Sequence, residues 1–270
     1  MTLIIGISGK KQSGKSSLAK FIQAHLFKNR HPDDYDFVQN PEGKIEWRML
    51  ASDFDFFKVK EPDAVGRECK IYSFADPLKQ DVCMKVLGLT HEQCYGTDEE
   101  KNSLTKYKWD RFDEIVRLSF AVKKKNGFPV SRSGFMTARE VLQVVGTEIF
   151  RKYFSQDVWV EATLNTIKEK APEIALIPDV RFRSEVEGIW SQGGYIIRLN
   201  RQLFQDSHAS EVDLDDYDFE AVVRCIEIHN STSTIEAKND LAISALETIL
   251  IKEKLDVERQ SCPTREQVSP

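Results

Sequence analysis

The amino-acid sequence predicts an α/β fold in which a central parallel sheet lies between layers of helices. Short apolar runs with little polar alternation, typical of strands buried on both faces, occur at residues 3–7, 174–177 and 195–199. Segments with helical spacing of apolar residues lie between such runs, as in α/β proteins. The 270 residues, of which 41% are hydrophobic, suffice for one large domain. We therefore expect a single domain over residues 1–255 and a polar, disordered tail over 256–270.

The N-terminal strand is followed by a helix whose apolar positions have helical spacing. These positions are Leu18, Phe21, Ile22 and Leu26. Residues 29–70 are polar and rich in turn signals, so we expect an insertion with one or two hairpins that is peripheral to catalysis. A second strand at residues 70–74 precedes a helix from Asp76-Pro77 to about Leu87, because proline is well placed in a first helical turn.

Capping signals and apolar runs mark the remaining elements. Residues 90–93 and 137–140 have the pattern of capping boxes that begin helices, and the second of these helices is expected to end near Val145. The later elements are a strand at 174–177, a helix at 184–190, a strand at 195–199, a polar loop at 200–218, a strand at 222–228, and a helix from the capping box at 233–236 to about Lys254.

Residues 9–16 read Gly-Lys-Lys-Gln-Ser-Gly-Lys-Ser between the first strand and the first helix, which is a complete phosphate-binding loop in its required context. The fold class is therefore a P-loop three-layer fold, with an inserted polar segment and a lid loop. Backbone N–H groups at the helix N-terminus would hold phosphates, and Lys15, as an exposed cation, would reach the β- and γ-phosphates. Ser16 suits a Mg²⁺ ligand. The candidate nucleotide-binding residues are Gly9, Lys11, Gln12, Ser13, Gly14, Lys15, Ser16 and Ser17. The alternative to a phosphate-binding loop at residues 9–16 is a lysine-rich surface turn.

Charged side chains follow the predicted strands at their carboxyl ends, where open parallel sheets bind ligands. Asp179 follows an apolar strand, so we expect it to be a second Mg²⁺ ligand, although a loop or N-cap aspartate is the alternative. Arg181 and Arg183 suit bidentate contacts with phosphate, and the alternative is ion pairing with Glu185 and Glu187. Such a set of cations around one acid matches what phosphate chains and one metal ion require.

Lys79 lies one turn into the helix that starts at Asp76, so its side chain is expected to point back over the edge of the sheet. The alternative is a solvated lysine on the surface of that helix.

Several motifs in order along the chain resemble the deoxynucleoside monophosphate kinases of tailed phages, within the P-loop nucleoside monophosphate kinase fold. The resembling segments are the phosphate loop, Ser73-Phe74-Ala75-Asp76-Pro77-Leu78-Lys79, Thr137-Ala138-Arg139-Glu140-Val141-Leu142-Gln143 with Gly146-Thr147-Glu148, Trp159, Pro178-Asp179-Val180-Arg181-Phe182 with Glu185, His208-Ala209-Ser210-Glu211, and the strand through His229-Asn230. The combination of an Arg-x-x-x-Gln-x-x-Gly-Thr helix with a later Asp-x-Arg is more specific than the phosphate loop alone. The resemblance covers about residues 1–20 and 70–250.

The resemblance implies transfer of the γ-phosphoryl group of ATP, with Mg²⁺, to a deoxynucleoside monophosphate. It places a monophosphate-binding region at residues 76–160. The implied substrate-binding residues are Lys79, Arg139, Gln143, Gly146, Thr147, Trp159, Asp179 and Arg181, and the implied catalytic residues are Lys15, Arg139, Asp179 and Arg181. Three alternatives stay open: Trp159 in the core, Arg139 in a surface ion pair, and a helix end at Gly146-Thr147.

The loop at residues 200–218 occupies the place of a lid in such kinases, with Arg201 as a candidate lid arginine. Its many acidic residues differ from arginine-rich lids. His208 and Glu211 match the family pattern, but no role follows for them from the residues.

The composition limits the kinds of partner and compartment that we expect for this chain. A net charge of −5 argues against nucleic acid, so small-molecule nucleotides are the expected partners. Five scattered cysteines fit reduced thiols in a cytoplasm, that of the host if the chain is phage-encoded. No apolar run is long enough to span a membrane, and the first strand is too short for a signal sequence. The oligomeric state, a homodimer included, stays open.

Two other functions remain compatible with these residues. One is another P-loop small-molecule kinase, acting on a nucleoside or a coenzyme precursor, with Asp179 as a base. The other is a P-loop NTPase switch or nucleic-acid module.

Overall fold

The computed structural model describes residues 2–10, 13–52, 55–62, 65–113, 117, 122–123, 129–130, 132–200, 214, 217–219, 224–229 and 234–261. The chain divides into two compact units, where we expected a single domain. Unit 1 comprises Met1–Tyr72 and Ile167–Pro270, and unit 2 comprises Ser73–Thr166. Unit 2 includes residues 76–160, the segment for which the family resemblance implies monophosphate binding.

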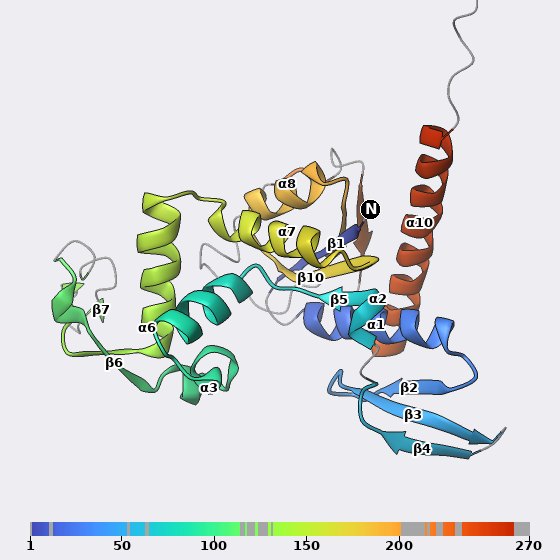
Figure 1. Ribbon diagram of the computed structural model, residues 1–270, viewed down its shortest axis with the longest axis horizontal. Helices are drawn as coiled ribbons and strands as arrows, with labels where there is room; N and C mark the ends of the chain where they lie inside the picture. The colour runs from blue at the N-terminus through green and yellow to red at the C-terminus, as the bar shows by residue number, and fades with distance from the viewer. Residues whose placement is uncertain are drawn as a thin grey trace, which may run out of the picture. The chain divides into compact units, whose positions relative to one another are not determined.

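Unit 1 contains a parallel sheet of five strands in the order β12-β11-β1-β10-β5 (Figure 1). The strands are β1 (Leu3–Gly9), β5 (Cys69–Ile71), β10 (Ile174–Val180), β11 (Tyr195–Leu199) and β12 (Cys225–Ile228). The predicted α/β class with a parallel sheet is therefore confirmed. The chain passes from β10 across β1 to β11, so the strand order reverses at β1. Such a reversal is where open α/β sheets bind ligands, beyond the carboxyl ends of the strands.

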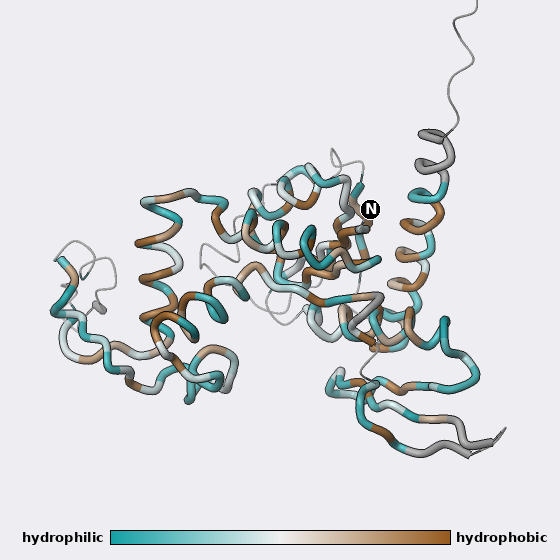
Figure 2. Tube along the Cα trace, viewed as in Figure 1, coloured by the Kyte–Doolittle hydropathy of each residue, from teal (hydrophilic) through white to brown (hydrophobic). Residues whose placement is uncertain are grey.

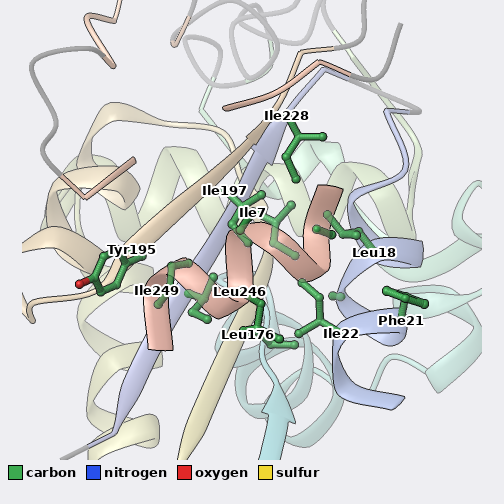
Figure 3. Close-up of a cluster of buried hydrophobic side chains, with 14 of the residues drawn as sticks. Ile7, Leu18, Phe21, Ile22, Leu176, Tyr195, Ile197, Ile228, Leu246 and Ile249 are labelled. Atoms are coloured by element: carbon green, nitrogen blue, oxygen red, sulfur yellow. The ribbon is translucent and has the colours of Figure 1, made fainter. Parts of the chain in front are cut away.

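The strands of this sheet are buried by helices on both faces. The helices of unit 1 are α1 (Lys15–Arg30), α2 (Val65–Glu68), α8 (Arg183–Ser191) and α10 (Ile235–Ser261), with the end of α7 (Val158–Lys170). Ile7 of β1 lies in a core with Leu18 of α1 and Leu246 of α10 (Figure 3). The residue before it in the pleat, Gly6, instead faces Ile189 of α8. This alternation explains why the strand residues are apolar throughout.

Helix α10 continues to Ser261, past the predicted helix end near Lys254 and into the segment predicted as a tail. Polar and apolar residues alternate along it (Figure 2). Its N-cap is Thr234, whose Oγ1 accepts a hydrogen bond of 3.3 Å from the N–H of Ala237. Ser233, the predicted cap, and residues 262–270 lie outside the described residues. Where the chain is described, none of its helices has the length and apolar character needed to cross a membrane.

Gly6 leaves no room for a side chain beneath α8. A Cβ atom there would lie 2.6 Å from Ile189 Cδ1 and 2.8 Å from Ile196 Cδ1. We expect Gly6→Ala to lower the free energy of unfolding by ~1–3 kcal/mol, the usual effect of overpacking a core. Gly66→Ala is the control, since nothing lies within 4 Å of a Cβ at that glycine. Urea unfolding of both variants tests this, and equal midpoints would contradict the packing of α8 on β1.

The inserted segment forms an antiparallel sheet of β2 (Tyr35–Gln39), β3 (Ile45–Ser52) and β4 (Asp55–Val59). The expected hairpins are therefore confirmed. The sheet packs on α1 through Trp47, which is 3% exposed and lies edge-on to Phe27 at a centroid distance of 5.6 Å.

Unit 2 is mainly helical, with small antiparallel strand pairs. Its elements are η1 (Pro77–Val86), α3 (His91–Tyr95), α4 (Asp98–Lys101), β6 (Leu104–Lys108), η2 (Trp109–Arg111), β7 (Val122–Lys123), β8 (Pro129–Val130), β9 (Phe135–Thr137), α6 (Ala138–Gln143), η3 (Val144–Arg151) and most of α7. Its core gathers around Cys83, Cys94, Trp109 and Met136. Burial raises the pKa of the Cys83 thiol to about 12, so this thiol stays protonated.

The capping boxes predicted at Thr90 and Thr137 are both present, and Thr97 forms another that the sequence analysis did not single out. The helix that begins at Ala138 does not end near Val145 as predicted. It passes from α6 into η3, a π-helical segment, and continues to Arg151. Both η1 and η3 are π-helical, a form that occurs often at functional sites.

Candidate active site

The phosphate loop joins β1 to α1 at the centre of the sheet. Gly9 has φ +148 and Gly14 has φ +91, backbone conformations that favour glycine. A Cβ on Gly9 would also lie 2.8 Å from the carbonyl oxygen of Leu199 on β11. The N–H of Ser13 donates to the oxygen of Lys10 at 3.1 Å, which closes the loop at the start of α1. Lys11 and Gln12, both predicted to bind nucleotide, lie outside the described residues.

Lys15 is not the exposed cation that the sequence suggested, because only 8% of its surface is accessible. Its Nζ donates to the carbonyl oxygens of Gly9 and Lys10, at 2.5 and 2.8 Å. The side chain therefore folds back over the loop, where backbone oxygens accept the hydrogen bonds that phosphate oxygens could accept instead. Ser16, the next residue, is exposed at the first turn of α1.

Asp179 lies on a β-bulge between β10 and β1. Gly6 pairs with Ile177 and Ser8 pairs with Val180, so Pro178 and Asp179 stand opposite Ile7 alone. Proline has no N–H for the ladder and is tolerated at such irregularities. The strand predicted to end at residue 177 thus continues to Val180. The bulge places Asp179 beside the end of β1, where the phosphate loop begins.

The turn that follows β10 is held by a buried carboxylate. Glu185 is 3% exposed, and its Oε2 accepts hydrogen bonds from the N–H groups of Arg181 at 2.7 Å and Phe182 at 3.1 Å. From the sequence, we expected Glu185 as an alternative ion-pair partner of the arginines and as part of the family resemblance, but not as a helix cap. Its position three residues after Phe182, the N-cap of α8, is the signal that could have indicated this role. Arg183 lies over the ring of Tyr217, 5.9 Å from its centroid.

In unit 2, Lys79 lies against an aromatic ring. Its Nζ is 4.5 Å from the ring centroid of Tyr95, which is a cation–π distance. The hydroxyl of Tyr95 donates to Asp76 Oδ1 at 2.7 Å, and the other oxygen of Asp76 accepts from the N–H of Ser73 at 3.2 Å. Burial and the hydrogen bond to Asp76 raise the pKa of Tyr95, so the phenol stays neutral. Tyr95 was not among the sequence-predicted residues.

Arg139, Gln143 and Thr147 recur at intervals of four along α6 and η3. Gln143 and Thr147 are exposed. Arg139 donates to Asp98 at 2.5 Å, and the Arg139 and Asp98 side chains are 43% and 87% exposed. The surface ion pair that the sequence left open for Arg139 therefore exists, and its partner is Asp98. Exposed pairs contribute only ~0–1 kcal/mol, so a phosphate could replace Asp98 at little cost.

Gly146 lies inside the continuous helix, so the alternative of a helix end at Gly146-Thr147 is wrong. A Cβ on Gly146 would lie 2.7 Å from Leu78 Cδ2, and its carbonyl oxygen accepts from Trp159 Nε1 at 3.0 Å. Trp159 is 5% exposed and its ring lies 5.0 Å from that of Phe150. The structure thus favours the core alternative for Trp159 over base stacking. Gly146 allows η1, which carries Lys79, to approach η3.

Arg201, His208 and Glu211, with most of the predicted lid, lie outside the described residues.

The order of the parallel sheet and the loop between β1 and α1 define a P-loop α/β protein, with Asp179 at the end of the strand beside β1. Residues 78–231, more than half of the chain, match the model of the deoxynucleotide monophosphate kinase family. The chain belongs to this family. The match includes Lys79, Arg139, Asp179 and Arg181, while the phosphate loop lies before it.

Two viral relatives are similar to the chain. A protein of Acanthamoeba polyphaga mimivirus, with the provisional name deoxynucleotide monophosphate kinase, is 29% identical over 158 residues, which are 53% of this chain and 67% of the relative. The deoxynucleoside-5′-monophosphate kinase of Escherichia phage T5 is 25% identical over 211 residues, which are 77% of this chain and 76% of the phage protein.

Proposed function

We propose that the protein transfers the γ-phosphoryl group of ATP to a deoxynucleoside 5′-monophosphate and releases ADP and a deoxynucleoside diphosphate. The phosphate loop with Lys15 carries this proposal, because it supplies a donor site to a chain of the deoxynucleotide monophosphate kinase family. Small-molecule nucleotides are its substrates. We further propose that it acts in a cytoplasm and without a nucleic-acid partner.

The donor site belongs to unit 1. Backbone N–H groups at the start of α1 would hold the phosphates, and Lys15 would exchange the carbonyls of Gly9 and Lys10 for phosphate oxygens. The exposed hydroxyl of Ser16 and the carboxylate of Asp179 are hard oxygen ligands, which suit Mg²⁺. The metal ion, when bound, neutralises charge on the phosphates. Arg181, on the turn held by Glu185, would add positive charge for the transferred group.

The acceptor-binding residues belong to unit 2. Lys79 and Arg139 are cations that would hold the 5′-phosphate, and Gln143 has both donor and acceptor atoms for a base edge. The acceptor phosphate is already an anion, so the reaction requires no general base. Catalysis on this proposal consists of positioning and charge neutralisation.

A coupled assay that measures ADP release from ATP tests the function. The release is compared in the presence of each deoxynucleoside or ribonucleoside monophosphate, of free nucleosides, and of DNA. We expect release to require a monophosphate. Turnover with nucleosides alone would instead indicate a nucleoside kinase, and stimulation by DNA alone would indicate a nucleic-acid module.

Arg139 and Gln143 lie four residues apart on α6, so they project from the same face of that helix. We expect Arg139→Ala to lower kcat/KM equally for all four deoxynucleoside monophosphates, because a phosphate contact carries no information about the base. We expect Gln143→Ala to change the ranking of the bases, by ~1–3 kcal/mol for those bases that use the amide. Steady-state kinetics with the four acceptors measures both effects. Equal losses for every base in both variants would exclude Gln143 as a base reader.

A further inference from the structure

Lys238, in the first turn of α10, lies beside the phosphate loop. Its Nζ is 3.6 Å from the position that a Cβ atom of Gly14 would occupy. Only 6% of Lys238 is exposed, a degree of burial that lysine seldom reaches. Gly14 is the N-cap of α1, so this ammonium group lies at the positive end of the α1 dipole, next to the residue that precedes Lys15.

The inserted sheet fixes this turn of α10 relative to α1. Asn239, which follows Lys238 and is 7% exposed, donates from Nδ2 to Gln39 Oε1 at 2.8 Å. Gln39 in turn donates from Nε2 to the Ser17 carbonyl oxygen at 3.0 Å and lies 3.1 Å from Ser17 Oγ. A third acceptor, the carbonyl oxygen of Gly43 in the β2–β3 turn, is 3.0 Å away. Gln39 therefore joins the insertion to α1, directly after Ser16, and to α10.

Close packing of the β2–β3 turn supports this arrangement. Gly43 has φ +80, and a Cβ atom there would lie 2.4 Å from Ser17 Oγ. The turn thus lies directly on the first turn of α1, whereas we expected the insertion to be peripheral to catalysis.

We propose that Lys238 is a second lysine of the donor site, which binds the phosphate chain of the nucleoside triphosphate, and that Gln39 positions it through Asn239. This rests on the proposed function of the phosphate loop. Lys15, Lys238 and the N-terminus of α1 bring positive charge to one loop, and positive charge there favours the binding of a polyanion. A triphosphate, with several negative charges, is such a polyanion.

The test compares Lys238→Met with Lys252→Met, an exposed lysine on the same helix. Methionine keeps the apolar stem and removes the charge. We expect Lys238→Met to raise both the dissociation constant and the KM for ATP about tenfold or more, with the KM for the acceptor unchanged, since one charge-assisted contact to phosphate is lost. Lys252→Met should leave all three constants at wild-type values, and Lys238→Arg should restore ATP binding to within about threefold of wild type.

Gln39→Ala measures the positioning role, with Glu42→Ala, an exposed residue of the same turn, as its control. We expect Gln39→Ala to raise the KM for ATP about three- to tenfold, with kcat and the acceptor KM changed less than twofold, because a displaced contact weakens donor binding first. If Lys238→Met does not fold, Lys238→Gln at the same site and Gln39→Ala decide the question.

Two results distinguish the proposals. A wild-type protein that neither binds ATP nor transfers phosphate contradicts the proposed function itself. A wild-type protein that does both, with equal ATP constants in the Lys238 variants and the Lys252 control, overturns this inference alone. Lower stability of Lys238→Met without a change in the KM for ATP also overturns it, because Lys238 would then only support the packing of α10.

Discussion

Lys15→Met reduces kcat/KM for phosphoryl transfer by at least about a hundredfold, on the expectation that its ammonium group contacts the transferred phosphate. Loss of one such contact in the transition state costs ~3 kcal/mol or more, which corresponds to this factor. The effect is expected mainly in kcat, because charge develops on the phosphate oxygens during transfer. The ADP-release assay over a series of nucleotide concentrations measures kcat and kcat/KM separately.

Stability has to be measured beside activity, since Lys15 also bonds to Gly9 and Lys10 in the free protein. We expect Lys15→Met to lower the free energy of unfolding by about 1.5–3 kcal/mol, the usual range for hydrogen bonds that involve a charged group. Lys20→Met, on the exposed side of α1, is the matched control and should retain full activity. Activity of Lys15→Met within tenfold of wild type would contradict the assignment of the phosphate loop.

Asp179→Asn should lower kcat about a hundredfold and raise the Mg²⁺ concentration that gives half-maximal activity. The substitution preserves the shape of the side chain but removes the negative charge that a Mg²⁺ ligand provides. The bulge places Asp179 at the end of β10 beside the phosphate loop, so the loss is expected at the metal and not in the core. Rates measured over a series of Mg²⁺ concentrations separate a weaker metal site from a slower chemical step.

Glu185→Gln is the control for this carboxylate. Glu185 accepts hydrogen bonds from two backbone N–H groups, so its substitution should reduce stability by ~1–3 kcal/mol without a change in the Mg²⁺ requirement. If the dependence of the rate on Mg²⁺ concentration is the same in Asp179→Asn as in the wild type, Asp179 is not a metal ligand. It is then a loop aspartate, the alternative that the sequence also allows.

The parts of the fold that the sequence predicted correctly are those encoded over short distances. The apolar run at residues 195–199 coincides with β11, and the capping boxes at Thr90 and Thr137 each lie within four residues. The phosphate loop is likewise a continuous motif between one strand and one helix. Such patterns report on local backbone preference and on burial, which neighbouring residues determine.

The features that were missed depend on residues far apart in the chain. Arg139 pairs with Asp98 across 41 positions, and Asn239 bonds to Gln39 across 200. Trp159 was undecided because an indole suits either a core or a stacked base, and only the positions of Phe150 and Gly146 favour the core. Lys238 gave no local signal, since its proximity to Gly14 follows from how α10 packs beside α1 within unit 1.

The bulge at Pro178 and Asp179 lets β10 meet two requirements independently. Residues 174–177 have to be buried beneath helices, and Asp179 has to lie at the end of the strand. In a regular strand, side chains alternate between the two faces, so the residue that reaches the strand end is dictated by the residues buried before it. One additional residue opposite Ile7 breaks that dependence. Residues 174–177 can therefore change with the helices that cover them while the carboxylate keeps its place. Deletion of a single residue from the bulge would again tie the place of the carboxylate to the residues buried before it. Among relatives, the bulge should therefore tolerate substitution far more readily than a change in length.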